Sequence, residues 1–272
     1  MKRIFCAAAA LLLPLTACGD GVRTQPEEPA WELVEEEAAV LPDGTAVGLW
    51  RMEQVDRWNC YRLPDGTELL EEQAPTGPAN VIVEGVEGFG QLGEAAQAAI
   101  GAYYEDQGLR YDLQAELERA YADYQSCQRS GETFEHYIAG QEVAPTASND
   151  HIVCFVTTTT RSVRGRLVEK DYFTAVFDRE TGEPLDPVSL FTVAPEEVLE
   201  RLLSAAQIYD SALREEMKAA WDPTWLELDS GSLSVYFPRG SLPSQETAYS
   251  FGVDVEDVRD ILHDWAVTRP PG

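Results

Sequence analysis

Hydrophobic and polar residues alternate along this chain with two periods, which separate helical from extended stretches. Between residues 92 and 127 the apolar positions recur at the spacing of one helix face, so two amphipathic helices joined near Gly108 are predicted. Tyrosines belong to this stripe, and we interpret them as core, with a ligand groove as the other interpretation. The stripe comprises Leu92, Ala95, Ala96, Ala99, Ile100 and Tyr103, then Leu113, Leu117, Ala120, Tyr121, Tyr124 and Cys127.

From Phe134 onward the period shortens to two. The segments FEHYIAGQEV, HIVCFVTTTT and DYFTAVFD are rich in β-branched and aromatic residues, which is typical of strands. Pro145 and Asn149-Asp150 are predicted to mark the first turn between them. We therefore expect three neighbouring antiparallel strands.

The part of the chain before the helices carries turn signals. PDGT occurs at residues 42–45 and again at 64–67, each time with Asp-Gly placed for a tight turn. Around the second copy, WNCYRL and ELLEE predict a β-hairpin. A short strand is predicted at Val81–Glu84.

The last third of the chain mixes both patterns. A long helix is predicted from Pro195 to Trp221, and two strands are predicted around Ser230-Gly231. A brief strand and a helix capped by Asp254 follow. Runs of strands and runs of helices indicate an α+β fold, in which an antiparallel sheet packs against a few amphipathic helices.

The N-terminus has the profile of an export signal. Lys2 and Arg3 precede an apolar run that is too short to span a bilayer. Leu15, Thr16 and Ala17 then stand before Cys18 in the order of a bacterial lipobox. We expect residues 1–17 to be a lipoprotein signal peptide and Cys18 to carry lipid, which would anchor the chain at the outer face of the bacterial cytoplasmic membrane.

Domain organisation follows from composition. Residues 18–46 are acidic and proline-containing, so a lipid-anchored linker is predicted there. We predict an N-terminal α+β part at 47–133, with a hairpin and two helices, and a C-terminal α+β part at 134–268. The two parts are expected to form one continuous body.

The charge of the chain narrows the classes of partner. Without the signal peptide, 18 basic residues face 48 acidic ones, a net charge of −30. Such a surface repels phosphate backbones, so no nucleic acid is expected, and it attracts cationic partners. Acidity that serves only solubility is the alternative.

Cysteine usage leaves one question open. Cys60, Cys127 and Cys154 remain in the exported body, either as buried thiols or with two of them in a disulfide. No C-x-x-C motif occurs, so the common redox and zinc signatures are missing.

The C-terminal half resembles a known family. In the order YFTAVFDRETGEPLDPVSLF, a helix, SLSVYFP and FGVDVEDVRDIL, it is similar to the outer domain of the lysozyme-sensing anti-sigma-V factors, a module also found beside some peptidoglycan deacetylases and in many lipoproteins. The resemblance covers residues 134–265 well and 78–133 loosely. It implies an α+β binding domain. SVRGRLVEKD, from Ser162 to Asp171, replaces the Gly-Gly-Ala-His-like loop of that family.

No motif in the sequence assigns a catalytic residue. His136, His151 and His263 match no metal motif, and the predicted hairpin allows His136 and His151 to face each other. No catalytic residue, metal ligand or cofactor is predicted. Acidic pairs are too abundant in this chain to indicate glycoside hydrolysis.

One basic island interrupts the acidic sequence. RSVRGR places Arg161, Arg164 and Arg166 together, and these are the candidate contacts for a partner. The sequence therefore favours a cell-envelope lipoprotein that acts as a non-catalytic binding or sensing module. The expected partner is a cationic protein such as a lysozyme-like hydrolase, or a cell-wall component. The alternative function is a peptidoglycan-acting enzyme or enzyme accessory.

Overall fold

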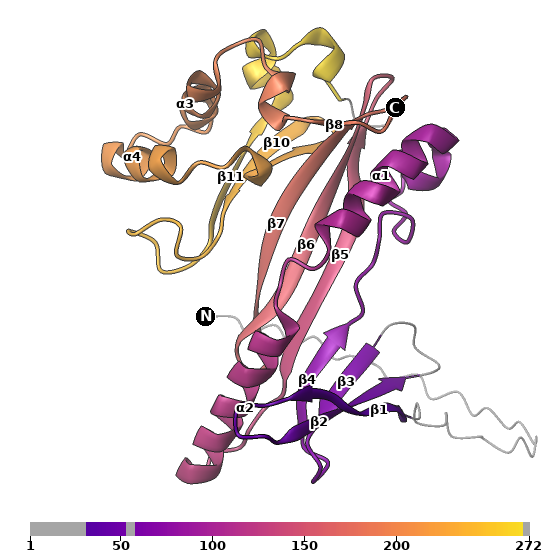
Figure 1. The fold of residues 1–272 in the computed structure, drawn as a ribbon. Helices are drawn as coiled ribbons and strands as arrows, with labels where there is room; N and C mark the ends of the chain where they lie inside the picture. Colours follow the sequence, from indigo (N-terminus) through magenta and orange to yellow (C-terminus); the bar gives the residue numbers. More distant parts are fainter. Residues whose placement is uncertain (1–30, 53–57, 269–272) are drawn as a thin grey trace, which may run out of the picture.

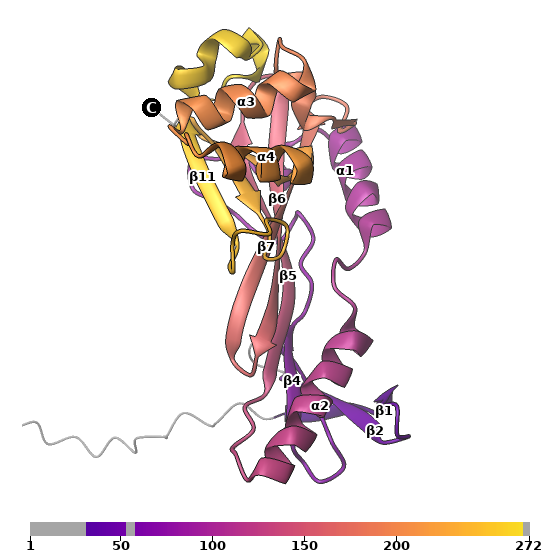
Figure 2. The same ribbon diagram turned by 90° about the vertical axis from the view of Figure 1, so that its left-hand side faces the viewer.

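The computed structural model describes residues 31–52 and 58–268, and the protein is an elongated α+β body in this range (Figure 1). This confirms the predicted fold class. Three long strands, β5 (Tyr137–Ser148), β6 (Ile152–Arg164) and β7 (Leu167–Asp178), run the length of the molecule (Figures 1 and 2). At about 3.3 Å per residue, β6 alone spans on the order of 40 Å.

The long strands belong to an eight-stranded sheet whose strands follow chain order. β4 and β5 pair in parallel, and the other neighbours are antiparallel. Since parallel neighbours need a crossover connection, the segment between β4 and β5 holds both helices of the N-terminal half. The remaining strands are β1 (Trp31–Val40), β2 (Ala46–Met52), β3 (Trp58–Arg62), β4 (Glu68–Gln73) and β8 (Pro184–Leu185).

Helices α1 (Glu94–Gln107) and α2 (Leu113–Ser130) cover the same face of this sheet. Side chains alternate along β5, so Tyr137, Ala139, Gln141 and Val143 share that face. The first two pack in the α2 core and Val143 in the α1 core. Gln141 lies between them. Its side-chain amide accepts a hydrogen bond from the backbone N–H of Arg110 and donates one to the backbone carbonyl of Gly108, in the segment that links the two helices.

A second layer covers the opposite face of the upper sheet (Figure 2). On β6, Ile152 and Cys154 pack into this layer, whereas Val153 and Phe155 pack under α1. Because both faces of β6 are covered here, its sequence is a nearly continuous apolar run. The layer consists of β9 (Leu226–Asp229), β10 (Ser232–Phe237), β11 (Tyr249–Asp254), α3 (Pro195–Ala205) and α4 (Ser211–Ala220).

The two PDGT turns were correctly placed, and both contact α2. Asp43 and Asp65 each accept a hydrogen bond from the backbone N–H of the threonine two residues later. Their second oxygens accept from the hydroxyls of Tyr121 at 2.8 Å and Tyr124 at 3.3 Å. The tyrosine stripe of α2 therefore packs against the sheet and its turns.

The predicted linker at 18–46 is wrong in its second half. Residues 18–30 lie outside the described residues, but Trp31–Val40 form β1, which pairs with β2 along most of its length. The acidic residues of β1 are exposed, so a charged edge strand gives the same composition as a solvated spacer.

Three further predictions of local structure are corrected. Val81–Glu84 is a loop. The helix predicted at Pro195–Trp221 is two helices, because Gln207 has a left-handed φ of 58° and Asp210 caps a new helix by accepting from the backbone N–H groups of Ala212 and Leu213. After β11 the chain forms a 3₁₀ helix, Val255–Ile261, without a side-chain cap from Asp254.

Two segments predicted to be turns or loops are largely strand. Pro145 lies within β5 at an irregularity of the β5–β6 pairing, where its missing N–H is tolerated, and the turn follows at residues 149–151. The SVRGRLVEKD segment is mostly strand, with the β6–β7 turn at Gly165.

Candidate functional site

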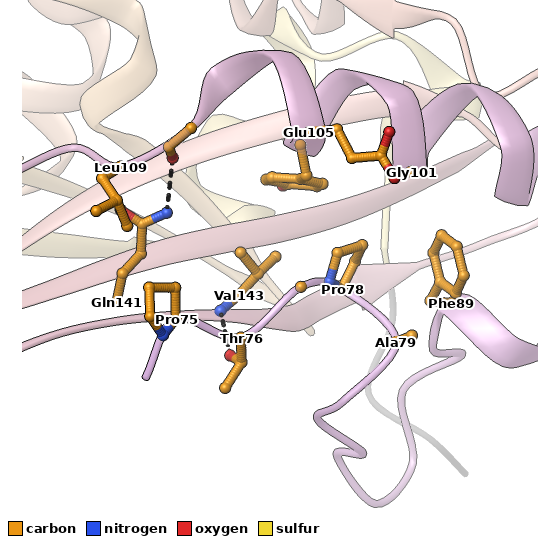
Figure 3. Close-up of a pocket in the computed structure, with 13 residues that line it drawn as sticks. Pro75, Thr76, Pro78, Ala79, Phe89, Gly101, Glu105, Leu109, Gln141 and Val143 are labelled. Atoms are coloured by element: carbon orange, nitrogen blue, oxygen red, sulfur yellow. Dashed lines mark hydrogen bonds between the residues drawn. The ribbon is translucent and has the colours of Figure 1, made fainter. Parts of the chain in front are cut away.

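A groove opens between α1 and the segment 75–79, beside β5 (Figure 3). Its volume is about 370 Å³, near the lower end of the roughly 300–1,000 Å³ of small-molecule pockets. It therefore accommodates one large side chain or a small group. The apolar residues that line it are Pro75, Pro78, Ala79, Phe89, Leu109 and Val143.

Small residues keep the wall on α1 open. Gly101 lies in the middle of the helix, where glycine costs roughly 0.5–1 kcal/mol relative to alanine. A Cβ at this position would meet nothing closer than Phe89 Cζ at 4.0 Å. Because Gly101 has no side chain, this part of the groove stays open.

Two polar residues that line the groove, Gln141 and Thr76, have hydrogen-bond partners within the protein. The side-chain amide of Gln141 forms hydrogen bonds with the backbone of the segment that links α1 and α2. Its backbone carbonyl accepts a hydrogen bond from the backbone N–H of Thr76 at 3.0 Å. The Thr76 hydroxyl accepts from the N–H of Val143 at 3.3 Å (Figure 3). The lining therefore behaves as an apolar surface.

Tyr104 supports the groove from the core side. Its ring packs edge-on against Phe155 and contacts Phe177. Burial raises the pKa of this tyrosine well above its ordinary value, and its hydroxyl finds no hydrogen-bond partner among the described residues. A hydroxyl that stays protonated and shielded from solvent has a packing role rather than an acid–base one.

The rim of the groove is acidic and partly apolar. Glu105 lines it, and the exposed Asp106 follows in the last turn of α1, which contains no basic residue. A neighbouring hollow shares Pro78 and Phe89 with the groove and contains Ile82, which is 92% exposed. Together with Leu109, which is 45% exposed, Ile82 extends the apolar surface beside the groove, and contiguous apolar surface is a feature of interaction sites.

Comparison with known proteins adds a structural likeness. No family model matches the sequence, and no curated protein matches it. The fold is similar to solved structures of DUF3298 family proteins from two bacteria. A member from Bacteroides fragilis aligns over 87% of this chain and 94% of its own, with a TM-score of 0.44 and 13% identity. A protein of the same family from Pseudomonas aeruginosa aligns over 90% and 98%, with a TM-score of 0.34 and 14% identity.

The predicted site residues do not lie in the groove. Cys18 lies outside the described residues. Arg161 pairs with Asp171 at 3.4 Å, Arg164 is exposed at the end of β6, and Arg166 donates to the ring of His136. The basic island is thus the tip of the β6–β7 hairpin, and two of its three arginines have partners within the fold.

One group of potential metal ligands lies on the helix-free face of the lower sheet. A register shift between β3 and β4 turns Glu68 and Glu71 to the same side, although residues three apart on a regular strand point to opposite faces. Together with His136 they bring three ligand atoms within 4.8 Å. Arg62 pairs with Glu68 at 2.6 Å and Arg166 bonds His136, so a cation would have to displace two guanidinium groups. We interpret this group as an ion-pair cluster.

The two histidines expected to face each other are far apart. His136 precedes β5, whereas His151 lies in the turn at the opposite end of that strand. Because the turn falls at residues 149–151, antiparallel pairing places the histidines at the two ends of the hairpin.

Cys60, Cys127 and Cys154, the cysteines of the described residues, are free and buried, which agrees with the first of the two alternatives left open by the sequence. Desolvation raises the pKa of Cys60 to about 11 and that of Cys154 to about 12. Burial also raises the pKa of Cys127. Thiols that remain protonated at neutral pH are poor nucleophiles, so they serve as small core residues.

A buried carboxylate outside the groove is fully bonded. Glu72 accepts from Asn59 at 2.8 Å, from the hydroxyl of Tyr61 at 3.1 Å and from that of Tyr111 at 2.6 Å. Burial raises the pKa of both tyrosines. This network fastens the α1–α2 link to the sheet and leaves little capacity for substrate.

Sequence reasoning missed the groove residues. Two signals were present: a glycine inside the first predicted helix, and the Pro-Thr-Gly-Pro segment at 75–78, which prevents regular pairing after β4. Neither signal indicates which helix the segment will face.

Proposed function

We propose that this protein is a non-catalytic binding module of the bacterial cell envelope that takes a cationic protein as its partner. The observation that carries the proposal is the open apolar groove with an acidic rim, set in a chain with 48 acidic residues. Apolar lining supplies desolvation energy, and the surrounding negative charge steers basic partners. The anchor in this proposal is lipid on Cys18.

Binding is favoured over catalysis because of how the polar groups are used. Gln141 and Thr76 are occupied by backbone partners, and the buried Glu72 accepts three hydrogen bonds. A catalytic site needs an acid, base or nucleophile aimed at the space that the substrate fills. In the groove, Glu105 is an exposed rim residue.

The resemblance of residues 134–265 to lysozyme-sensing domains supplies a partner of suitable chemistry. Lysozyme is strongly basic, and an acidic surface attracts it at long range. This attraction is screened as the Debye length falls from about 10 Å at 0.1 M salt to about 3 Å at 1 M.

A paired binding experiment tests the proposal. The full-length protein, purified in detergent, is immobilised and exposed to hen egg-white lysozyme and to α-lactalbumin, which has the same fold and an acidic surface. We expect lysozyme alone to bind, with affinity about tenfold weaker in 0.5 M than in 0.05 M salt. Equal binding of the two proteins, or none of lysozyme, would contradict a function based on charge.

A further inference from the structure

We infer that the groove beside α1 receives one apolar side chain of the partner, flanked in the partner by basic residues, and that Gly101 sets the size of side chain admitted. This inference rests on the proposed function, because it assumes a cationic protein partner. It adds the contact that makes recognition selective among cationic proteins.

The dimensions of the groove favour a single side chain. A volume of about 370 Å³ is too small for a helix or a glycan strand, and its walls are apolar. Pro75 and Pro78 stiffen the wall opposite α1 because their φ angles are fixed. The groove is thus largely preformed, and a partner would lose little free energy in shaping it.

We call the partner side chain that enters the groove the anchor side chain. The charge around the groove favours basic residues on either side of it in the partner. Glu105 carries a carboxylate at the groove, close to the helix end where the backbone dipole is negative. Arg110 lies over the ring of Phe173 at 4.2 Å and Arg179 pairs with Glu87 at 2.5 Å, so neither forms an ion pair with Glu105 in the part of the chain that the structure describes. A lysine or arginine next to the anchor side chain therefore meets a carboxylate that has no ion-pair partner among the described residues.

Exposed apolar side chains beside the groove enlarge the surface that an anchor would bury. Ile82 is 92% exposed and Leu109 is 45% exposed, and both lie next to the groove or line it. Covering such side chains is favourable for association. Binding energy is then concentrated at a central apolar contact with a charged periphery, as in other protein interfaces.

Two matched variants test the role of Gly101. Gly101→Leu puts an isobutyl group into the groove, whereas Ala102→Leu adds a leucine to the exposed side of the same helix. Leucine is a better helix former than glycine, so Gly101→Leu should melt at the same or a higher temperature than the unmodified protein. A loss of binding in this variant then reports a filled groove rather than unfolding.

The probes are two lysine-rich peptides that differ only in one central residue, Phe or Ser. By titration calorimetry on the full-length protein in detergent, we expect the Phe peptide to bind about tenfold tighter or more, since burying the ring is favourable. Gly101→Leu should reduce the Phe peptide to the affinity of the Ser peptide, and Ala102→Leu should leave the difference intact. Glu105→Gln should weaken both peptides.

The outcomes separate this inference from the proposed function. If both peptides bind the unmodified protein equally, or if Gly101→Leu behaves like Ala102→Leu, the groove is not the anchor site, although charge-driven binding of lysozyme stands. If neither peptide nor lysozyme binds, the proposed function itself is overturned, and the inference with it.

Discussion

Helices α1 and α2 come from consecutive segments and cover the same face of the same sheet, yet they are held in different ways. α2 begins at Asp112, whose side chain accepts from the N–H of Ala115, and ends at Gly131 in the left-handed conformation. α1 has no side-chain cap at Gly93 and carries Gly101 in its interior. The helix with stronger local signals packs closely, and the weaker one borders the groove.

Helix α2 also has more contacts that hold it to the sheet than α1 has. α2 is tied to two turns of the sheet through Tyr121 and Tyr124, in addition to its buried Leu117. α1 buries Ile100 and Tyr104, and the face beside them is left open at Gly101. This division suits a binding module, because one helix secures the fold while the other presents a surface.

Truncation of buried side chains should give the largest loss of stability, and it tests whether α1 packs more loosely than α2. Leu117 and Ile100 are both fully buried, so Leu117→Ala and Ile100→Ala should each destabilise the fold by about 2–5 kcal/mol. We expect Ile100→Ala to lie at the lower end, because its surroundings can relax toward the groove. Urea unfolding measures both, and a larger loss for Ile100→Ala would contradict the looser packing of α1.

The N-terminal end of α1 is set by one close backbone approach, which predicts the next largest effect. Gly182 has a φ of +73°, and a Cβ there would lie 2.5 Å from the carbonyl oxygen of Ala96. Gly182→Ala should therefore cost about 2–3 kcal/mol, from left-handed strain together with displacement of α1. Thermal unfolding measures the loss, and hydrogen exchange in α1 should increase.

Gly66→Ala is the matched control for that change. Gly66 has a φ of +88° but nothing within 4 Å of a Cβ, so only the strain of about 1 kcal/mol remains. Equal losses in the two variants would show that the contact between Gly182 and Ala96 does not position α1.

The fold was predictable where local sequence and tertiary structure agree. The two PDGT turns, the helices before and after Gly108 and the strands from residue 137 follow from turn chemistry and periodicity. The linker prediction failed because strand β1 has exposed acids on a sheet edge, a pattern that resembles a solvated chain. The break at Gln207 was missed because apolar spacing continues across it.

The site was less predictable, because its residues come together only in three dimensions. Pro75–Pro78, Gly101 and Val143 belong to separate segments, and the parallel pairing of β4 with β5 determines that they meet. Similarly, Glu68 and Glu71 share a face only because of the irregularity opposite Tyr61 and Arg62. Motif spacing in one sequence contains neither fact.

The smallest predicted effect concerns the tyrosine contacts that secure α2. The hydrogen bond from Tyr121 is the main cause of the lowered pKa of Asp43, so Tyr121→Phe should raise that pKa toward its ordinary value of about 3.9. A carboxylate with a lowered pKa stabilises the fold above its unfolded pKa, and this contribution is lost as pH falls through the folded pKa. The variant and the unmodified protein should therefore differ in stability at neutral pH and converge in acid.

Tyr124→Phe sharpens that test, because the two turns are bonded unequally. The lowered pKa of Asp65 has the backbone N–H of Thr67 as its main cause, and the hydroxyl of Tyr124 is farther away, at 3.3 Å. An NMR titration of the carboxyl carbons should thus show a smaller shift for Asp65 in Tyr124→Phe than for Asp43 in Tyr121→Phe. Equal shifts would mean that the hydroxyl contacts are equivalent, and that α2 is tied to both turns by the same interaction.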